Sequence, residues 1–184
     1  MARHRIFIAI NFPPRTKKEF VSYQKKWGDL PIRWTRENNL HLTLVFLGSV
    51  DDRDLPEVIE RTNKAAENHH PFSIDFNRIF LGPPGRTPRM FWLEGRENQE
   101  LSDLKADLAG ELEALSFKEE KRSFRPHITL GRIKMDSWAR LQNKPKIEEK
   151  ISVILPVNSI EIMESHLKST GPDYFILESI NLGE

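Results

Sequence analysis

The sequence predicts an α+β fold built from two similar lobes. Segments with helical spacing of apolar residues stand among many short strand-like runs, without the strict alternation of strand and helix that a doubly wound sheet requires. A four-residue pattern also occurs twice, as His41-Leu42-Thr43-Leu44 and His127-Ile128-Thr129-Leu130. At 184 residues the chain can bury a sizeable core. We expect residues 1–184 to form one bilobal domain with pseudo-twofold symmetry, whose two sequence-discontinuous lobes each supply half of one site.

The first half of the chain alternates apolar runs with clear stop signals. Residues 5–11 are predicted to form a buried strand that ends before Pro13-Pro14, and residues 16–27 have aromatic side chains at helical spacing. Strands are expected over residues 32–35 and 40–47, the second closed by Gly48. Asp51 or Asp52 is expected to cap the helix that follows, whose apolar residues between 55 and 66 fall on one side.

The second half repeats this organisation with variations. Strands are expected over residues 72–81 and 90–93, separated by the turn-forming run Gly82-Pro83-Pro84-Gly85. Leucines spaced by three or four residues predict a helix over residues 97–115. Residues 123–133 hold the second motif, and residues 136–142 are assigned a short helix. The remaining strands are expected over residues 151–155, 159–166 and 174–180.

Each copy of the motif is expected to place an imidazole and a hydroxyl on one face of a strand. Alternate residues of an extended chain point the same way, so His41 would share a face with Thr43, and His127 with Thr129. The intervening residues would then pack behind that face. The flanking residues are apolar, as packing requires; they are Leu40, Val45, Phe46 and Leu47 in the first copy, and Phe124, Ile128, Leu130 and Ile133 in the second.

Composition limits the classes of function. Charged residues make up 30% of the chain, but 28 Lys plus Arg nearly balance 27 Asp plus Glu, so no global field attracts nucleic acid or an anionic membrane. Affinity for phosphate must therefore come from local clustering. The chain has no cysteine, which excludes disulfides, zinc–thiolate sites and a thiol nucleophile. The apolar run near the N-terminus is too short for a signal peptide, and we expect a cytoplasmic protein without membrane contact.

The duplicated motif resembles that of one known family. The matching stretches are residues 6–10, Trp34, residues 39–48, residues 91–93, Arg125-Pro126-His127-Ile128-Thr129-Leu130-Gly131-Arg132, and residues 165–174. A single His-x-Thr pattern is common, but the pair with these flanks and this spacing is specific. The sequence resembles the two-histidine phosphoesterases, and within them the RNA 2′,3′-cyclic phosphodiesterases, historically described as 2′-5′ RNA ligases.

The resemblance implies both a fold and an activity. The implied fold has two antiparallel sheets that form a central cleft, with helices on the outside. The implied activity is hydrolysis of a 2′,3′-cyclic phosphate on an RNA 3′ end or a nucleotide to a 2′-phosphomonoester, with a weak reverse reaction that joins RNA halves through a 2′-5′ bond. By the same resemblance, His127 activates water and His41 protonates the leaving 3′ oxygen. The pseudo-symmetry makes the opposite assignment chemically equivalent.

The chemistry of these residue types fits that activity. Histidine has an ordinary pKa of about 6.5, so a neutral imidazole can accept a proton while a charged one donates. Hydroxyls of Thr43 and Thr129 can donate to non-bridging phosphate oxygens. Arg132 is the candidate for a cationic clamp, because a guanidinium matches phosphate oxygens in pairs. Candidates for contact with RNA or a base are Trp34, Lys121, Arg122 and Arg125.

Two other functions stay open at this point. The cleft could hold a nucleotide or RNA end without turning it over, or it could act on another small cyclic phosphate or on a 2′-5′ oligoadenylate. No metal or other cofactor is expected, because two histidines with two threonines make an incomplete zinc set and lack the clustered carboxylates that magnesium prefers. No obligate protein partner is expected either.

Overall fold

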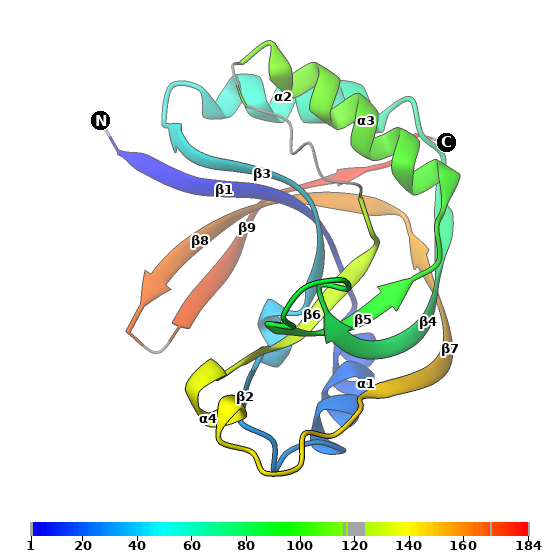
Figure 1. Cartoon of the computed structure of the whole chain (residues 1–184). Helices are drawn as coiled ribbons and strands as arrows, with labels where there is room; N and C mark the ends of the chain where they lie inside the picture. Colours follow the sequence, from blue (N-terminus) through cyan, green and yellow to red (C-terminus); the bar gives the residue numbers. More distant parts are fainter. Residues whose placement is uncertain (1, 116, 118–123, 170, 184) are drawn as a thin grey trace.

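The computed structural model describes residues 2–115, 117, 124–169 and 171–183, and its architecture is α+β, as the sequence predicted. The strands and helices follow one another along the chain in an irregular order (Figure 1). They are β1 (Arg3–Asn11), α1 (Pro14–Lys25), β2 (Ile32–Trp34), the 3₁₀ turn η1 (Glu37–Asn39), β3 (His41–Asp51), α2 (Leu55–Ala66), β4 (Phe72–Gly82), β5 (Met90–Gly95), α3 (Gln99–Glu113), β6 (His127–Ile133), α4 (Met135–Ala139), β7 (Glu148–Val157), β8 (Ser159–Lys168) and β9 (Gly171–Asn181).

The strands form one nine-stranded sheet in the order β7-β4-β5-β6-β3-β1-β8-β9, with β2 paired to β6. We call β1, β3, β8 and β9 the His41 half, and β2, β4, β5, β6 and β7 the His127 half. The recorded pairings are antiparallel. Where two separate sheets were expected, the described residues are joined by a pairing of β3 with β6 through Leu42 and Ile128.

The helices lie on different sides of the sheet (Figure 1). Helices α2 and α3 pack against each other, and α3 also touches β3. Helix α1 contacts β6, the motif strand of the His127 half. Helix α3 begins where the Asn98 side chain accepts a hydrogen bond of 2.7 Å from the Leu101 backbone NH, which satisfies one of the free donors of the first turn. Helices α3 and α1 therefore each pack against one of the two motif strands.

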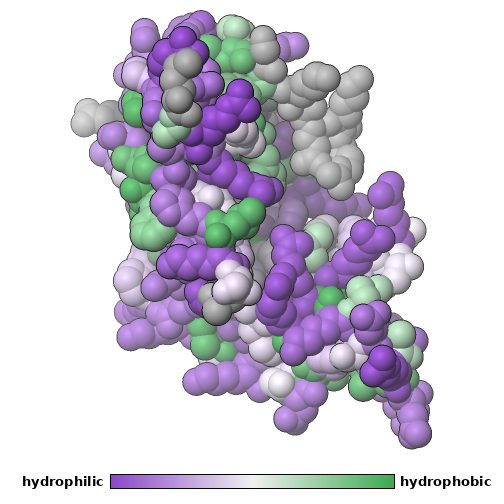
Figure 2. Space-filling view, turned by 90° about the vertical axis from the view of Figure 1, so that its left-hand side faces the viewer, coloured by the Kyte–Doolittle hydropathy of each residue, from purple (hydrophilic) through white to green (hydrophobic). Residues whose placement is uncertain are grey.

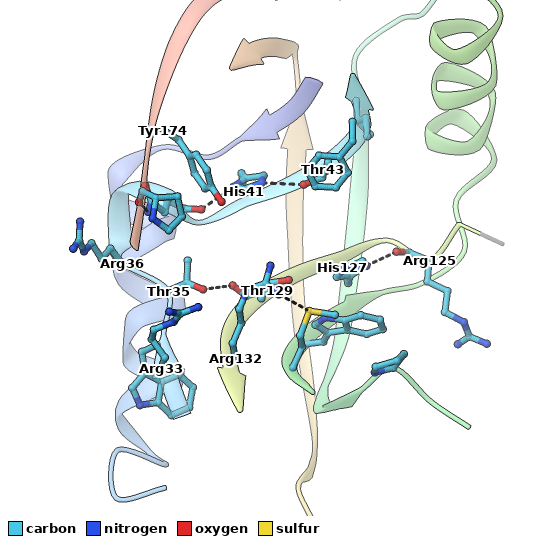
Figure 3. Close-up of a pocket in the computed structure, with 18 of the residues that line it drawn as sticks. Arg33, Thr35, Arg36, His41, Thr43, Arg125, His127, Thr129, Arg132 and Tyr174 are labelled. Atoms are coloured by element: carbon cyan, nitrogen blue, oxygen red, sulfur yellow. Dashed lines mark hydrogen bonds between the residues drawn. The ribbon is translucent and has the colours of Figure 1, made fainter. Parts of the chain in front are cut away.

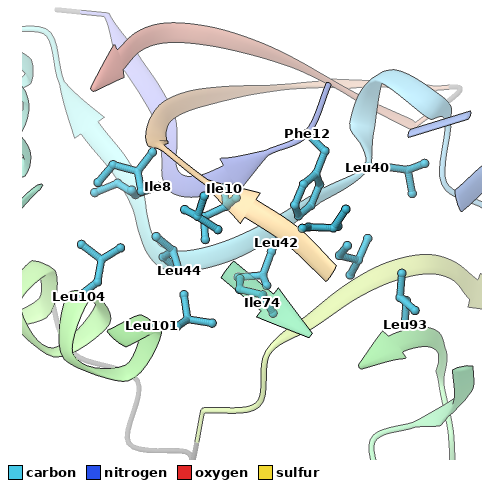
Figure 4. Packing of buried hydrophobic residues seen from close by; sticks show 14 of the residues in the cluster. Ile8, Ile10, Phe12, Leu40, Leu42, Leu44, Ile74, Leu93, Leu101 and Leu104 are labelled. Atoms are coloured by element: carbon cyan, nitrogen blue, oxygen red, sulfur yellow. The ribbon is translucent and has the colours of Figure 1, made fainter. Parts of the chain in front are cut away.

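A single cluster of buried apolar side chains runs through both halves (Figure 4). Residues of β1 and β3, such as Ile10 and Leu42, pack in it together with Ile74 of β4 and Leu93 of β5. Leu101 and Leu104 add the buried side of α3. The predicted leucine-rich helix thus supplies core, and the motif strands are anchored from behind.

Several predicted boundaries differ from the structure, and two of them lie between β3 and α2. Gly48 does not end its strand: β3 continues to Asp51, and Gly48 lies inside it with a φ of 76°, a conformation that glycine adopts without strain. The residue before α2 is Asp54 rather than Asp51 or Asp52, and its side chain makes no capping hydrogen bond. Both errors have one cause, because a glycine that permits an irregularity inside a strand looks in the sequence like a strand end.

The face shown in Figure 2 is mostly hydrophilic, and apolar side chains appear on it as small separate patches. Large exposed apolar residues include Phe46 and Ile154, which are 66% and 67% exposed. Among the described residues, no helix has the length and apolar character that a membrane crossing needs.

Candidate active site

The two motifs meet at their central residues. Leu42 of β3 pairs antiparallel with Ile128 of β6, so His41 lies on the side of Thr129 and Thr43 on the side of His127 (Figure 3). The four polar side chains are half-buried and line the same cleft. The period of two that the sequence indicated therefore holds in both strands. The structure brings together the four residues that the duplicated motif singled out.

Both imidazoles are held in the same way by the backbone just before them. Nδ1 of His41 donates to the Asn39 carbonyl at 2.7 Å, and Nδ1 of His127 donates to the Arg125 carbonyl at 2.8 Å. These bonds place the ring proton of a neutral histidine on Nδ1, which leaves Nε2 as a proton acceptor. In the first motif, the Thr43 hydroxyl donates to Nε2 of His41 at 2.9 Å.

His41 sits in the more enclosed environment. Its ring contacts Phe7 at 5.0 Å between centroids and meets Tyr174 nearly edge-on at 5.2 Å. Burial lowers the pKa of His41 from 6.5 to about 4; the hydrogen bond to Asn39 opposes this, and the charges of Lys17 and His127 add to it. His41 is therefore neutral at pH 7 in the free protein.

His127 instead stacks on an indole. The ring centroids of His127 and Trp92 are 4.0 Å apart and the planes differ by 29°. Trp92 is buried, with Phe80 edge-on to it, and fits because position 82 is glycine: a Cβ there would lie 2.4 Å from Cε3 of the indole. An aromatic face of this kind stabilises a nearby positive charge. This contact could not be predicted from the sequence, in which Trp92 has the pattern of an ordinary core residue.

A buried polar network fixes the second motif strand. The Thr35 hydroxyl donates to the Thr129 carbonyl at 2.8 Å. The Gln24 amide of α1 donates to the carbonyls of Thr35 and Leu130, at 2.8 and 2.9 Å. The Leu130 carbonyl also accepts a hydrogen bond of 2.9 Å from the Thr35 backbone NH, so these bonds connect α1, residue 35 and β6. They hold β6 at the depth where Thr129 reaches the cleft.

Each motif strand carries a β-bulge just after its threonine. Thr43 pairs with Ala9 and Val45 with Ile8, so Leu44 has no partner in β1. In the same way Thr129 pairs with Trp92 and Gly131 with Phe91, which leaves Leu130 extra in β6. One extra residue reverses the alternation of side chains beyond it. The residue five positions after each histidine therefore joins the cleft face: Phe46 in β3 and Arg132 in β6.

The cleft concentrates positive charge. Its volume is about 640 Å³, and among its described lining residues none is acidic. Arg33 and Arg132 are direct cross-strand partners of β2 and β6 and both line it. Like charges placed opposite each other repel, so a bound anion would stabilise this pair. The cationic lining residues are Arg33, Arg36, Arg86, Lys105, Arg125 and Arg132.

The other predicted contact residues have different outcomes. Arg125 lines the cleft but also binds the buried Glu94 at 3.3 Å. Trp34 lines it too, although its indole packs on Phe91 at 5.1 Å and its Nε1 is buried without a hydrogen-bond partner in the described structure. Lys121 and Arg122 lie outside the described residues.

Several residues that line the cleft were not predicted from the sequence. Tyr174 of β9 reaches the cleft beside His41. Arg36 forms an ion pair of 2.8 Å with Asp173, which ties the β8–β9 hairpin to η1. The Asn39 side chain adds a bond of 2.7 Å to the Pro172 carbonyl. Arg33 and Arg36 flank Trp34 in the sequence, and that pattern could have indicated them. Among the described residues no cluster of His, Cys, Asp and Glu could hold a metal ion.

The sequence matches a known family over most of its length. The family is described as LigT like Phosphoesterase, and the match covers residues 10–92 and 94–174. Both histidine motifs lie inside the matched ranges.

Several proteins similar to this chain have a more specific name or a solved structure. An RNA 2′,3′-cyclic phosphodiesterase of Thermotoga maritima is 34% identical, covering 94% of this chain and 92% of its own. A protein of the same name from Methanocaldococcus jannaschii is 29% identical, covering 95% and 98%. Among solved structures, TT0787 of Thermus thermophilus superposes with a TM-score of 0.84 at 26% identity, covering 98% and 99% of the two chains. E. coli LigT complexed with 3′-AMP superposes with a TM-score of 0.81 at 22% identity over the whole of both chains, a likeness of fold.

Proposed function

The chain belongs to the LigT like phosphoesterase family, and from that membership we propose that it hydrolyses 2′,3′-cyclic phosphates at RNA 3′ ends or on nucleotides. Water adds to phosphorus, the bond from phosphorus to the 3′ oxygen breaks, and the products are a 2′-phosphomonoester and a free 3′ hydroxyl. Two relatives that cover nearly the whole chain bear the name of this activity. Each histidine and each threonine of the duplicated motif has a role in this reaction.

The observation that carries the proposal is the pairing of the two motif strands at Leu42 and Ile128. This pairing puts two imidazoles on one face, with a threonine beside each. Phosphodiester hydrolysis needs a base for the attacking water and an acid for the leaving oxygen, and each transfer is typically worth about 10²–10⁴-fold in rate. Two histidines with their Nδ1 protons held by backbone carbonyls supply both through Nε2.

Following the family resemblance, we assign His127 to the water and His41 to the 3′ oxygen. Nε2 of His127 takes a proton from water as the oxygen attacks, and the Trp92 face stabilises the imidazolium that forms. His41, whose pKa is about 4 in the free protein, must gain its proton when an anionic phosphate enters, because an adjacent negative charge raises the pKa of a histidine. A proton held on so weak a base is readily given to the leaving oxygen.

The remaining groups hold the phosphate. Hydroxyls of Thr43 and Thr129 donate to its non-bridging oxygens, where charge builds up in the transition state. Arg132, with Arg33 opposite it, supplies the cationic clamp. These donors make no use of a metal ion, and we propose that none is needed. We propose that the 2′-5′ ligation uses the same groups: a ribose 5′ hydroxyl takes the place of water and adds to the phosphorus of a cyclic phosphate end. The bond from phosphorus to the 3′ oxygen breaks, which leaves a 2′-5′ phosphodiester and a free 3′ hydroxyl.

The wider setting is also part of the proposal. We propose that residues 1–184 act as a single bilobal domain, supported by the core cluster that runs through both halves of the sheet. An RNA 3′ end or a nucleotide is the proposed partner, and the cytoplasm the proposed location.

The decisive experiment is incubation of the protein with adenosine 2′,3′-cyclic phosphate, with the products resolved by ³¹P NMR. We expect a 2′-monoester to appear and to be formed equally with and without EDTA. RNA oligomers of increasing length with a cyclic end, an ADP-ribose cyclic phosphate and a 2′-5′ oligoadenylate complete the panel.

Each alternative has its own outcome in this panel. Binding of the cyclic nucleotide without any monoester would identify a binding module. Turnover confined to the oligoadenylate or to another small cyclic phosphate would identify a different phosphodiesterase. Formation of a 3′-monoester would contradict the proposed bond cleavage, and loss of turnover in EDTA would contradict the metal-free chemistry.

A further inference from the structure

Glu94 is a buried carboxylate that lies directly opposite His127 in the sheet. The two residues are cross-strand partners of β5 and β6, and only 7% of Glu94 is exposed. Residues that are directly opposite in an antiparallel pair point to the same face, with Cβ atoms about 4.5–5.5 Å apart. Trp92 lies two residues earlier on β5 and stacks on His127, which confirms that Glu94 shares this face. The carboxylate has no role yet in the proposed reaction.

Two arginines hold this carboxylate. Arg78, the partner of Glu94 on β4, donates from Nε to one carboxylate oxygen at 2.5 Å. The Arg125 guanidinium donates to the other oxygen at 3.3 Å. A buried charge is stable only when it is paired and hydrogen-bonded, and both conditions are met here. Arg78, Glu94 and His127 therefore form one row across three neighbouring strands.

Arg125 connects the carboxylate to the imidazole. Its side chain binds Glu94, and its backbone carbonyl accepts the hydrogen bond of 2.8 Å from Nδ1 of His127 (Figure 3). The next carbonyl, that of Pro126, accepts a bond of 2.8 Å from the Gly95 backbone NH. The segment that orients the His127 ring is thus fixed to β5 by its side chain and by its backbone.

The matching position in the other half carries no charge. Asn11 is the partner of His41 on β1, as Glu94 is the partner of His127 on β5. The Asn11 Oδ1 atom is buried and has no hydrogen-bond partner among the described residues. The Lys17 ammonium of α1 adds to the lowering of the His41 pKa that burial causes. An acid thus lies opposite one histidine and an amide opposite the other.

The charges around His127 are otherwise positive. The charged and titratable groups near it are Glu94 of β5, Arg78 of β4, Arg125 and Arg132 of β6, His41 of β3, and the cleft residues Arg33, Arg36, Arg86 and Lys105. Among these described groups, Glu94 is the one that carries a negative charge. An adjacent negative charge favours the protonated form of an imidazole, and an adjacent positive charge opposes it.

We propose that Glu94 is a positioning residue that assigns the role of base to His127, an inference that rests on the proposed function. It anchors the Arg125 segment whose carbonyl orients the imidazole. Its carboxylate stabilises the imidazolium that forms when the attacking water gives up its proton. The amide of Asn11 provides no such charge at His41, which suits a group that must release its proton to the leaving oxygen.

The test follows the titration of the His127 ring by two-dimensional NMR, with its signal identified by its loss in His127→Asn. In Glu94→Gln the titration midpoint should fall by about 1 pH unit, because Arg78 and Arg125 offset part of the effect of the carboxylate. For adenosine 2′,3′-cyclic phosphate, kcat should fall about three- to tenfold as the base weakens, with KM largely unchanged. Glu94→Asp, which keeps the charge, should retain most of both properties.

Two further variants control for burial and for symmetry. Glu161→Gln removes another buried carboxylate, on β8 of the His41 half, and should leave the His127 titration unchanged. Asn11→Asp places a carboxylate opposite His41 and should raise the titration midpoint of His41 above about 4. If Glu94→Gln does not fold, the same comparison can be made in Arg78→Gln, where adding Glu94→Gln leaves two neutral groups that can still bond to each other.

An unchanged His127 midpoint in folded Glu94→Gln would overturn the inference, as would an equal fall in Glu161→Gln. A lower midpoint with unchanged kcat would also overturn it, because the charge would then have no effect on the reaction. If the unmodified protein does not hydrolyse the cyclic nucleotide, the proposed function fails. The titration midpoints then decide separately whether Glu94 acts on His127.

Discussion

His41 and His127 occupy matching positions on β3 and β6, but their rings have different neighbours. His41 lies among Phe7 and Tyr174, and burial lowers its pKa to about 4. His127 stacks on the face of Trp92. Both rings keep the same bond from Nδ1 to a backbone carbonyl two residues earlier. The duplication thus preserved the orientation of each imidazole and changed what favours or opposes its charge.

The difference between the halves shows how a symmetric frame can serve an asymmetric reaction. A base and an acid must differ in their readiness to hold a proton, although both are imidazoles. In the proposed mechanism this difference comes from side chains of neighbouring strands, Phe7 of β1 and Tyr174 of β9 at His41 and Trp92 of β5 at His127. The same division applies one step further along each strand, where the cleft face carries Phe46 on β3 and Arg132 on β6.

The strongest test of this comparison removes each imidazole in turn. His41→Ala and His127→Ala should each lower kcat for adenosine 2′,3′-cyclic phosphate by about 10²–10⁴-fold, because each removes one proton transfer. Steady-state kinetics, with circular dichroism to verify folding, make the measurement. His70→Ala, an exposed histidine outside the cleft, is the matched control. Full activity in either cleft variant would eliminate the two-imidazole mechanism.

A second test concerns the charged wall of the His127 half. Arg132→Ala should lower kcat/KM by about 100-fold, the scale seen when one donor to developing oxyanion charge is removed. Arg132→Lys should recover only part of the loss, because an ammonium cannot bind two phosphate oxygens in parallel. The exposed Arg140, which lies outside the cleft, provides the control as Arg140→Ala. If Arg132→Ala and Arg140→Ala behave alike, the clamp is assigned to the wrong residue.

A third test perturbs the support of His127 without touching the motif. The Cβ of Gly82→Ala would collide with the Trp92 indole, and overpacking of this kind costs about 1–3 kcal/mol of stability. Displacement of the indole should also lower kcat and shift the limb of the pH–rate profile that reports His127. Chemical denaturation and kinetics on the same sample separate the two effects. Gly110→Ala, where a Cβ meets nothing within 4 Å, is the control. An unchanged pH–rate profile would mean that the stacked ring does not affect the reaction.

The smallest expected effect is the contribution of His41 to the pH dependence of stability. Since the pKa of His41 is about 4 when folded and about 6.5 when unfolded, the unfolded chain binds the extra proton between these values. The free energy of unfolding should therefore decrease as the pH falls from 6.5 to 4. Urea denaturation at several pH values should show a smaller decrease in His41→Asn than in the unmodified protein, and His127→Asn serves for comparison. Equal decreases in the unmodified protein and His41→Asn would contradict this account of His41.

The sequence was sufficient for the parts of the fold that depend on local pattern. Strand and helix identities follow from periodicity, and the period of two correctly placed His41 with Thr43 and His127 with Thr129. What joins the motifs could not be predicted in this way. The pairing of Leu42 with Ile128 links residues that lie far apart in the chain, and nothing local in either strand specifies its register.

Irregular backbone accounts for the remaining errors. Leucine is the extra residue of both bulges, and a leucine in an apolar run gives no indication that the alternation reverses there. Phe46 was therefore assigned to the core, although Arg132 was still identified by its charge. Trp34, the candidate for base contact, lines the cleft while its ring packs on Phe91, and Tyr174 reaches the same cleft from a hairpin distant in sequence.

The paired bulges also have a consequence for how such a protein can diversify. Each lies beyond the histidine and threonine, so a substitution five positions after the histidine changes the wall of the cleft and leaves the motif backbone in place. One half can then carry a ring at this position and the other a cation, while both keep the histidine and the threonine. Selection for a new substrate can act at these two positions without changing the histidines and threonines of the motifs.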